Sequence, residues 1–310
     1  MVIMKMFFQK TDIRTLALLR MLIGGWFFVD YVSMIIIGRV HEAYIDSLVN
    51  FPFYGLEFIK PLPAEGMYVI FVLAALAGAG IAIGYRYYLS LSVFFVIHLY
   101  VFLIDIVYSL NKFYLFLILA FVLFFMQAHR YWSQDVKQGR VTPIDWVPRW
   151  NTLTFQVFYG LIYTYSGISK LNPDWLLQAE PLRTFFSHNW LFGSVEGDIF
   201  EVIIYTFTYG GMIFDLTITW LLVNRKTNVF GNIWQASFHL LNFFLLGIGS
   251  LSLFMAASTW LLFPTKWLKK KIGLQRYDGI CETSSVHQRW VVAGLSVFMF
   301  IHVLAPHRHY

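Results

Sequence analysis

The sequence has few charged residues and a single cysteine. Asp, Glu, Lys and Arg together make up 13% of the 310 residues, whereas about 25% is usual for a soluble domain. Cys281 is the only cysteine, so the chain cannot form an internal disulfide or a metal site built on paired cysteines. Hydrophobic residues reach 58% and aromatic residues 20%, with a mean hydropathy of +0.63. This composition predicts an integral membrane protein with little soluble mass.

Several motifs of soluble enzymes are also missing. The sequence has no HExxH, no Gly-rich phosphate loop, no carboxylate cluster and no Ser, His and Asp in the order of a hydrolase triad. Nothing therefore indicates a metalloprotease, an NTPase or a hydrolase, and we expect no bound metal. The net charge of +6 is spread over several short loops and not gathered in one patch, so we expect no nucleic-acid partner.

Long apolar segments fill most of the remaining sequence. A helix needs about 20 mainly apolar residues to cross a hydrocarbon core about 30 Å thick, and such runs predict about nine transmembrane segments. We therefore predict an all-α fold, a polytopic integral membrane helical bundle in which residues 1–310 form a single domain. The predicted helices cover residues 13–37, 66–84, 88–105, 112–128, 152–169, 199–223, 229–247, 250–264 and 290–305.

The basic residues of the loops predict the orientation of these helices. Lys and Arg collect in the cytoplasmic loops of membrane proteins. Here one set of alternate loops holds most of them, from Lys5 near the N-terminus to Arg289, while the other set is richer in acidic residues. We therefore expect a cytoplasmic N-terminus and an external C-terminus, with the longest outer loops at about 38–65 and 170–198.

Several polar side chains fall inside the predicted helices. An ionisable group there is energetically costly, so it usually faces the bundle interior and is a candidate for function. Each residue can also have a purely structural role. Arg20 and Asp30 can pair with other helices or with the backbone. Asp105 and Lys112 suit interfacial charges beside an outer turn, and a lone histidine is often a satisfied core group. The full set is Arg20, Asp30, His98, Asp105, Lys112, Lys170, Asp215, His239 and Asn242.

Lys170 is the most informative of these residues. It follows the apolar run 161–169 and precedes Pro173, which cannot continue a helix. One hypothesis is that the lysine extends to the membrane interface. The other is that burial beneath the outer loop leaves a neutral amine, which can act as a base. Elsewhere, His239 and Asn242 lie three residues apart, hence on one face of a helix.

Seven motifs, spread in order over nearly the whole chain, resemble those of a known family. They are Pro61-Leu62-Pro63, the segment 121–135 with Tyr131-Trp132-Ser133, Gly167-Ile168-Ser169-Lys170-Leu171, Asp174-Trp175, the segments 187–192 and 238–242, and Ile248-Gly249. In this order they resemble the vitamin K-dependent gamma-carboxylase family, whose membrane part is called the HTTM domain.

The resemblance implies a chemistry as well as a fold. Carboxylases of this family deprotonate reduced vitamin K, a naphthohydroquinone, and let O₂ add to it. The strong base that results removes a γ-proton from a peptide glutamate, which then takes up CO₂, and the quinone becomes an epoxide. The resemblance thus implies a gamma-carboxylase-like membrane enzyme, with reduced vitamin K as cofactor and O₂ and CO₂ as co-substrates.

The resemblance also implies roles for individual residues. Lys170 lies at the position of the family lysine assigned as the base for the hydroquinone. Lys112 lies where the family's carboxylases have a histidine, and we expect it to be the second catalytic residue. The residues expected to contact the quinone are His98, Trp175, Trp190, His239 and Asn242.

Two departures from the family pattern leave other functions open. Lys112 replaces the histidine, and the sequence ends at Tyr310, where the carboxylases continue into a large luminal β-rich region; we expect a short form. The alternative is a non-catalytic member that binds quinone or lipid, or that aids the maturation of an exported peptide. A transporter is a third class, but the sequence lacks paired discontinuous helices. The expected partners are membrane lipid, a quinone and an exported peptide.

The orientation can be checked with reporter fusions. A reporter fused after Tyr310 should be external, and one inserted near Gln138 should be cytoplasmic, because the surrounding loop carries Arg130, Lys137 and Arg140. Alkaline phosphatase is active outside the cytoplasm and green fluorescent protein inside it, so the two reporters give opposite signals at each site. The reverse pattern would overturn the orientation and the external placement of Lys170.

Overall fold

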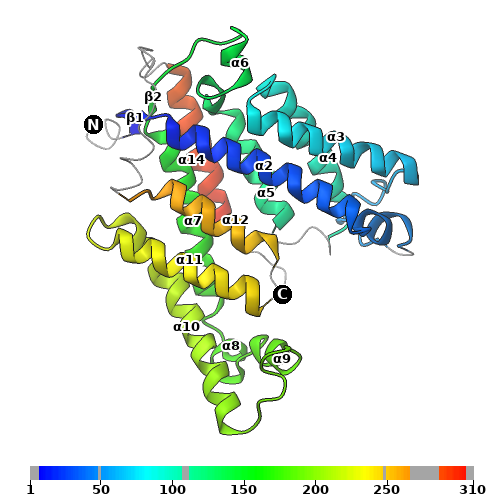
Figure 1. Ribbon diagram of the computed structural model, residues 1–310, viewed down its shortest axis with the longest axis vertical. Helices are drawn as coiled ribbons and strands as arrows, with labels where there is room; N and C mark the ends of the chain where they lie inside the picture. The colour runs from blue at the N-terminus through cyan, green and yellow to red at the C-terminus, as the bar shows by residue number, and fades with distance from the viewer. Residues whose placement is uncertain (1–6, 48–49, 107–111, 247–248, 266–285, 305–310) are drawn as a thin grey trace. The chain divides into compact units, whose positions relative to one another are not determined.

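The computed structural model describes residues 7–47, 50–106, 112–246, 249–265 and 286–304 and is mainly helical there (Figure 1). The predicted all-α fold is confirmed. Ile248 of the last motif, the basic stretch 266–285 and residues 305–310 lie outside the described residues. The long helices are α2 (Arg14–Ile36), α3 (Ala64–Ile83), α4 (Tyr87–Ile104), α5 (Lys112–Phe124), α7 (Trp150–Ser169), α10 (Asp198–Val223), α11 (Asn228–Leu245), α12 (Ser250–Leu262) and α14 (Val286–Leu304).

A long helix lies at each of the nine predicted positions in the described part of the chain. By length and composition, α2, α3, α4 and α10 can cross a membrane, and α5 and α12 are shorter apolar helices. The helices thus fit an integral membrane protein. Nine crossings stay a prediction, as does the orientation of the termini.

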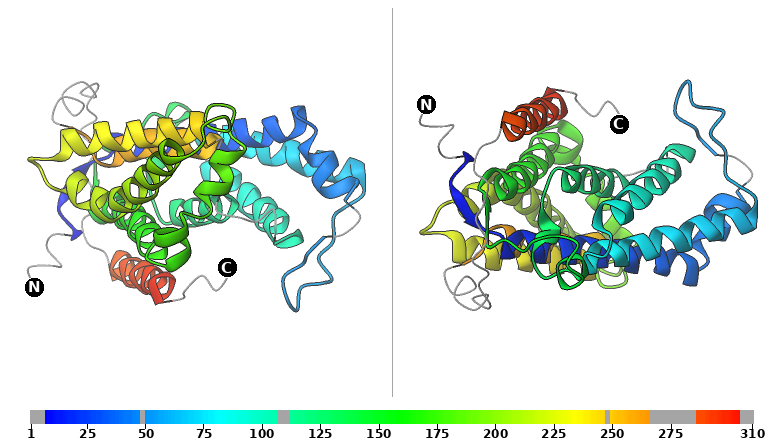
Figure 2. Two further views of the ribbon diagram at one scale, coloured as in Figure 1. Left: turned by 90° about the horizontal axis from the view of Figure 1, so that it is seen from below. Right: turned by 90° about the horizontal axis from the view of Figure 1, so that it is seen from above.

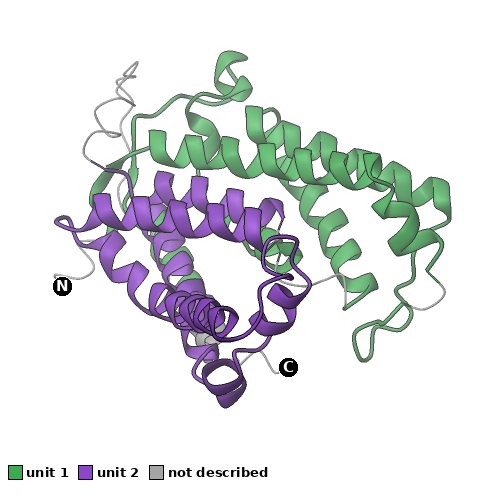
Figure 3. Ribbon diagram, turned by 60° about the horizontal axis from the view of Figure 1, so that its bottom comes forward, with its two compact units in different colours: residues 1–151, 274–295 green, residues 152–273, 296–310 purple. Residues whose placement is uncertain are grey.

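The chain divides into two compact units (Figure 3). Unit 1 comprises residues 1–151 and 274–295, and unit 2 comprises residues 152–273 and 296–310. Unit 1 contains α2 to α5 and a short antiparallel ladder. Unit 2 contains nearly all of α7 together with α10, α11 and α12. The short elements are β1 (Lys10–Asp12) paired with β2 (Trp146–Pro148) in unit 1, and α8 (Pro173–Gln178) and α9 (Leu182–Ser187) in unit 2.

Helices α2 and α3 of unit 1 pack closely along their length (Figure 2). The contact depends on glycine. A Cβ atom added at Gly24 would lie 2.3 Å from the backbone nitrogen of Ala82, and one added at Gly78 would lie 2.7 Å from that of Phe28. Lipid provides no hydrophobic force between helices, so close packing through small residues stabilises the pair.

The turn at residues 128–140 contacts both α2 and the start of α4. The guanidinium group of the fully buried Arg20 donates to the carbonyl oxygens of Ala128, Tyr131 and Trp132, the last at 2.8 Å. An unpaired charge inside an apolar helix would be costly. The structural alternative for Arg20, a partner of the backbone, is therefore confirmed.

Asp135 in the same turn caps the first residues of α4. Its carboxylate accepts hydrogen bonds from the amides of Arg86 and Tyr87 at 2.8 and 2.9 Å and pairs with Arg140 at 3.0 Å. Burial disfavours the ionised form, but the donors outweigh burial and lower the pKa of Asp135 below its usual value. The turn is thereby attached to both α2 and α4.

In unit 2, α7 is joined to its neighbours by polar side chains. Tyr159 donates to Ser258 of α12 at 2.8 Å, and the hydroxyl of Tyr163 lies 2.8 Å from Nε2 of His239 in α11. Tyr159 and Tyr163 are four residues apart, so they lie on one face of α7. The helix stops before Pro173, which begins α8, and this predicted helix end is confirmed.

Adjacent glycines of α2 provide a matched test of the contact with α3. Gly24→Ala should lower the free energy of unfolding by about 1–3 kcal/mol, because the new methyl group would meet the backbone of Ala82. Gly25→Ala should be neutral or stabilising, because no atom lies within 4 Å of a Cβ there and alanine is the better helix former. Thermal unfolding in detergent measures the difference, and equal effects would contradict the close approach.

His129 should make the fold sensitive to mild acid. Burial lowers the pKa of His129 to about 4, with Asp135 opposing this shift and Arg20 and Arg130 adding to it. A histidine in the unfolded chain has a pKa of about 6.5, so His129 binds a proton more readily in the unfolded chain than in the folded one. The contribution of neutral His129 to stability is therefore complete above about pH 6.5 and is lost as the pH falls toward about 4.

The measurement is thermal unfolding of the wild type and His129→Phe over this range of pH. The variant should lose less stability on acidification, because no imidazole has to be protonated. Identical pH dependence in both proteins would show that His129 does not cause the sensitivity.

Candidate functional site

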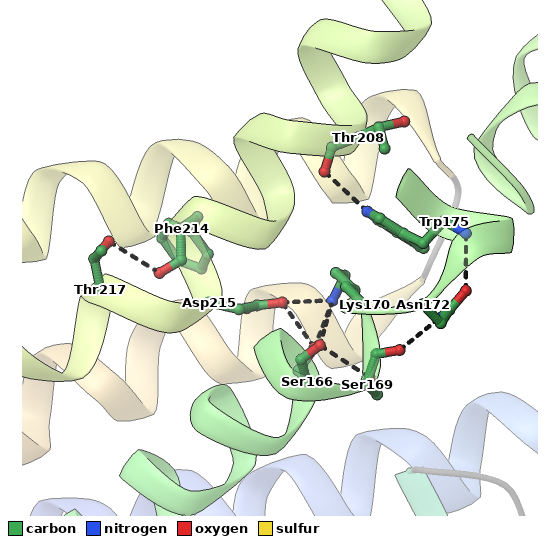
Figure 4. A network of polar contacts seen from close by, with 9 residues as sticks. All are labelled: Ser166, Ser169, Lys170, Asn172, Trp175, Thr208, Phe214, Asp215 and Thr217. Carbon is green, nitrogen blue, oxygen red and sulfur yellow. Dashed lines mark hydrogen bonds and ion pairs between the residues drawn. The ribbon is translucent and has the colours of Figure 1, made fainter. Parts of the chain in front are cut away.

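Lys170 follows the last residue of α7, and its side chain turns back along that helix (Figure 4). The amine Nζ donates to the carbonyl oxygen of Ser166 at 3.1 Å and to its hydroxyl at 2.7 Å. The Lys170 side chain is only 16% exposed. This geometry favours the hypothesis of a buried amine over that of a lysine that extends to the interface.

A carboxylate from another helix completes the contact. Oδ2 of Asp215 in α10 lies 2.5 Å from Lys170 Nζ and accepts the hydroxyl of Ser166 at 2.7 Å. The Asp215 side chain is 5% exposed, so the ion pair is largely withdrawn from water. Removal of one partner from such a pair would leave an uncompensated charge. Lys170 and Asp215 therefore depend on one another.

Trp175 covers one side of the amine. The centre of its ring lies 5.0 Å from Lys170 Nζ, within the range of a cation–π interaction. The indole nitrogen donates to the carbonyl of Thr208 in α10 at 3.0 Å, and the backbone amide donates to Asn172, which caps α8. The ring and the backbone of Trp175 are thus both held in place (Figure 4). We call Ser166, Lys170, Trp175 and Asp215 the lysine site.

Lys112, the other predicted catalytic residue, belongs to unit 1 and has a partner of the same kind. It begins α5, and its amine donates to Asp30 of α2 at 2.8 Å. Asp30 is 4% exposed and Lys112 28%. The structural alternative for Asp30, a partner of another helix, is confirmed. Each of the two predicted catalytic lysines therefore pairs with a buried aspartate of a different helix.

His98, a predicted quinone contact, lies in the core of unit 1 with both ring nitrogens engaged. Nε2 lies 2.8 Å from the carbonyl oxygen of Phe113 and must donate to it, because a carbonyl only accepts. In the neutral ring, Nδ1 then accepts the hydroxyl of Tyr31 at 2.8 Å. These contacts are those of a satisfied core group, and a quinone contact of His98 stays a prediction.

The remaining predicted quinone contacts belong to unit 2. His239 is buried and lies 2.8 Å from the hydroxyl of Tyr163, whereas Asn242 of the same helix is partly exposed. Trp190 is 80% exposed. The structure thus brings Trp175 to the Lys170 amine and places Trp190 on the surface.

A pocket of about 560 Å³ opens at another place in unit 2. None of its lining residues belongs to the lysine site, so this pocket does not locate a ligand of Lys170. The candidate site is therefore defined by polar contacts, and a quinone pocket beside it stays a prediction. The lining residues are Arg225, Asn228, Val229, Asn232, Ile233, Trp260 and Thr265.

The amino-acid sequence alone does not predict the contacts of Lys170 with Asp215 and Ser166. Asp215 stood out as an ionisable residue inside a helix, but 45 positions separate it from Lys170, and no local pattern links the two. The available signal was charge balance, because an aspartate deep in an apolar helix requires a partner from another helix.

The family model described as HTTM domain matches residues 8–267, a range that contains Lys112, Lys170 and Asp215. No solved structure matches the chain.

Removal of one partner of the ion pair in the lysine site should destabilise the fold. Asp215→Leu should lower the free energy of unfolding by about 3–5 kcal/mol, because it leaves the buried ammonium group of Lys170 without a partner. The double variant Lys170→Met/Asp215→Leu should recover most of this loss, since neither charge remains. Thermal unfolding of the two single variants, Asp215→Leu and Lys170→Met, and of the double variant measures the interaction between the two residues. If the stability lost in the double variant equals the sum of the losses in the two single variants, the ion pair is not formed.

Proposed function

Because the chain belongs to the HTTM domain family, the membrane part of the vitamin K-dependent carboxylases, we propose that it is a membrane enzyme acting on a reduced naphthoquinone. In this proposal Lys170 removes the proton of a hydroquinone hydroxyl. The reduced quinone then reacts with O₂ to form an epoxide, and this reaction drives the carboxylation of a peptide glutamate with CO₂. The observation that carries the proposal is the buried contact of Lys170 with Asp215.

The base must be neutral before it accepts a proton. A hydroquinone hydroxyl has a pKa of roughly 10, by comparison with tyrosine. Asp215 offers a place for the proton that would otherwise stay on the amine. A site withdrawn from water penalises the charged pair, so a neutral amine beside a protonated carboxyl group is closer in free energy to the ion pair than it would be in solution. The free amine of Lys170 then accepts the hydroxyl proton and becomes an ammonium ion.

Ser166 and Trp175 suit this role. Ser166 holds the amine in place, and Trp175 provides a surface on which a substrate can bind beside the amine. The Ser166 hydroxyl lies between Lys170 Nζ and Asp215, at 2.7 Å from each. Trp175 presents an aromatic face beside the amine, and a planar quinone ring can stack favourably on such a face. Lys112, at the position of the family histidine, is proposed as a second catalytic residue.

Lys170→Arg tests the base without removing the cation. Arginine keeps the charge that pairs with Asp215 but stays protonated, so turnover should fall by about 10²–10⁴-fold, the usual contribution of a general base. The matched control is Lys226→Arg, an exposed lysine in the loop after α10, which should keep full turnover. The measurement is epoxide formed from reduced vitamin K and O₂, and CO₂ incorporated into a glutamate peptide, by the purified protein.

Two outcomes would contradict the proposal. Wild-type turnover in Lys170→Arg would show that the amine is structural and that the base lies elsewhere. If the wild-type protein binds the quinone but forms neither product, the chain is the non-catalytic binding protein of the alternative hypothesis.

A further inference from the structure

The pocket lined by Arg225 lies where three helices of unit 2 end or begin. Its volume of about 560 Å³ is within the range of about 300–1,000 Å³ that is usual for ligand sites. Arg225 follows the end of α10 at Val223, Asn228 begins α11, and Trp260 lies in the last turn of α12. Because α10 is long and apolar enough to cross a membrane, its end, and the pocket with it, belong at the membrane surface.

Two asparagines of α11 hold the three helix ends together. The side-chain amide of Asn228 donates to the carbonyl oxygens of Leu222 in α10 and of Phe263, which caps α12, at 2.8 and 3.1 Å. The amide of the buried Asn232 donates to the same Phe263 carbonyl at 3.0 Å. The last carbonyls of a helix have no partner within it, so these bonds fix the helix ends. The shape of the pocket is therefore set by the protein.

Arg225 gives the pocket a positive charge. It is the one charged residue among the described residues that line the pocket. It is exposed, and none of the ion pairs between described residues includes it. The sequence from 216 to 265 contains no Asp or Glu that could neutralise it. The pocket therefore favours an anion, and a guanidinium group suits a phosphate because it can donate two parallel hydrogen bonds.

The remaining side of the pocket is apolar and exposed. Val229 is 57% exposed, Ile233 60% and Trp260 45%. Val229 and Ile233 are four residues apart, so they lie on one face of α11 and continue it along the helix by about 6 Å. Neither α11 nor α12 contains Asp, Glu, Lys or Arg, so no charge interrupts this face. A soluble anion would leave these side chains uncovered, whereas a lipid would cover them.

We propose that this pocket binds an anionic phospholipid, with the phosphate on Arg225 and the acyl chains along Val229, Ile233 and Trp260. A tryptophan at the level of the headgroups is typical of membrane proteins. A zwitterionic lipid carries the same phosphate, but its ammonium group would meet a cation and no carboxylate among the lining residues that the structure describes. The pocket should therefore distinguish the two classes of lipid.

Two adjacent basic residues provide a matched test. Arg225 lines the pocket, whereas Lys226 is exposed in the same loop and is not among the lining residues. Native mass spectrometry of the detergent-purified full chain counts the lipids bound from an equal mixture of phosphatidylglycerol and phosphatidylcholine with the same acyl chains. The wild type should bind phosphatidylglycerol about fivefold better, the factor expected for one basic residue at an anionic surface. Arg225→Gln should lose this preference, and Lys226→Gln should keep it.

A third variant tests the apolar side. Ile233→Ser should weaken the binding of both lipids and keep the preference, because Arg225 is still present. Unchanged binding of both lipids would contradict the proposed contact of the acyl chains. Thermal unfolding of each variant without added lipid checks that the fold is kept.

Two further outcomes would overturn the proposal. An equal loss of preference in Arg225→Gln and Lys226→Gln would show that the general charge of the loop attracts the lipid. Displacement of phosphatidylglycerol by the same concentration of inorganic phosphate would show that the pocket takes a free anion. The test involves no turnover, so its outcome is independent of the proposed quinone chemistry.

Discussion

Charged side chains inside apolar helices must find partners within the protein, because water is absent there and an isolated charge is strongly disfavoured. Arg20 of α2 is held by backbone carbonyls of the turn at 128–140. Asp30 of the same helix pairs with Lys112, and Asp215 of α10 pairs with Lys170. Each of these contacts joins segments that are far apart in the sequence. The need to satisfy a few charges thus determines which segments lie side by side within each unit.

Between the charged contacts, the helices associate by means that suit a lipid environment. The α2–α3 pair relies on glycines that bring the two backbones together, and α7 relies on tyrosine hydroxyls bonded to α11 and α12. Lipid is as apolar as a leucine side chain, so burial of apolar surface stabilises such pairs little. Close packing and interhelical hydrogen bonds take its place.

The lysine site belongs to the same network that holds unit 2 together. Asp215 joins α10 to the end of α7, and Trp175 joins α8 to α10 through Thr208. The groups proposed for proton transfer are therefore also structural contacts, and their geometry is set by three helices. This arrangement keeps the amine in one position, which proton transfer to a bound substrate requires.

The amino-acid sequence by itself determined the membrane class, the places of the helices and the family. These properties depend on local composition, on runs of about 20 apolar residues and on ordered motifs, and Pro173 ended α7 as the chemistry of proline requires. The partners of the polar residues were decided by the tertiary structure alone. Helical periodicity shows which residues share a face, but it does not show which helix that face meets. For this reason the contact of Lys170 with Asp215, 45 positions away, and the engagement of both nitrogens of His98 could be seen only in the folded chain.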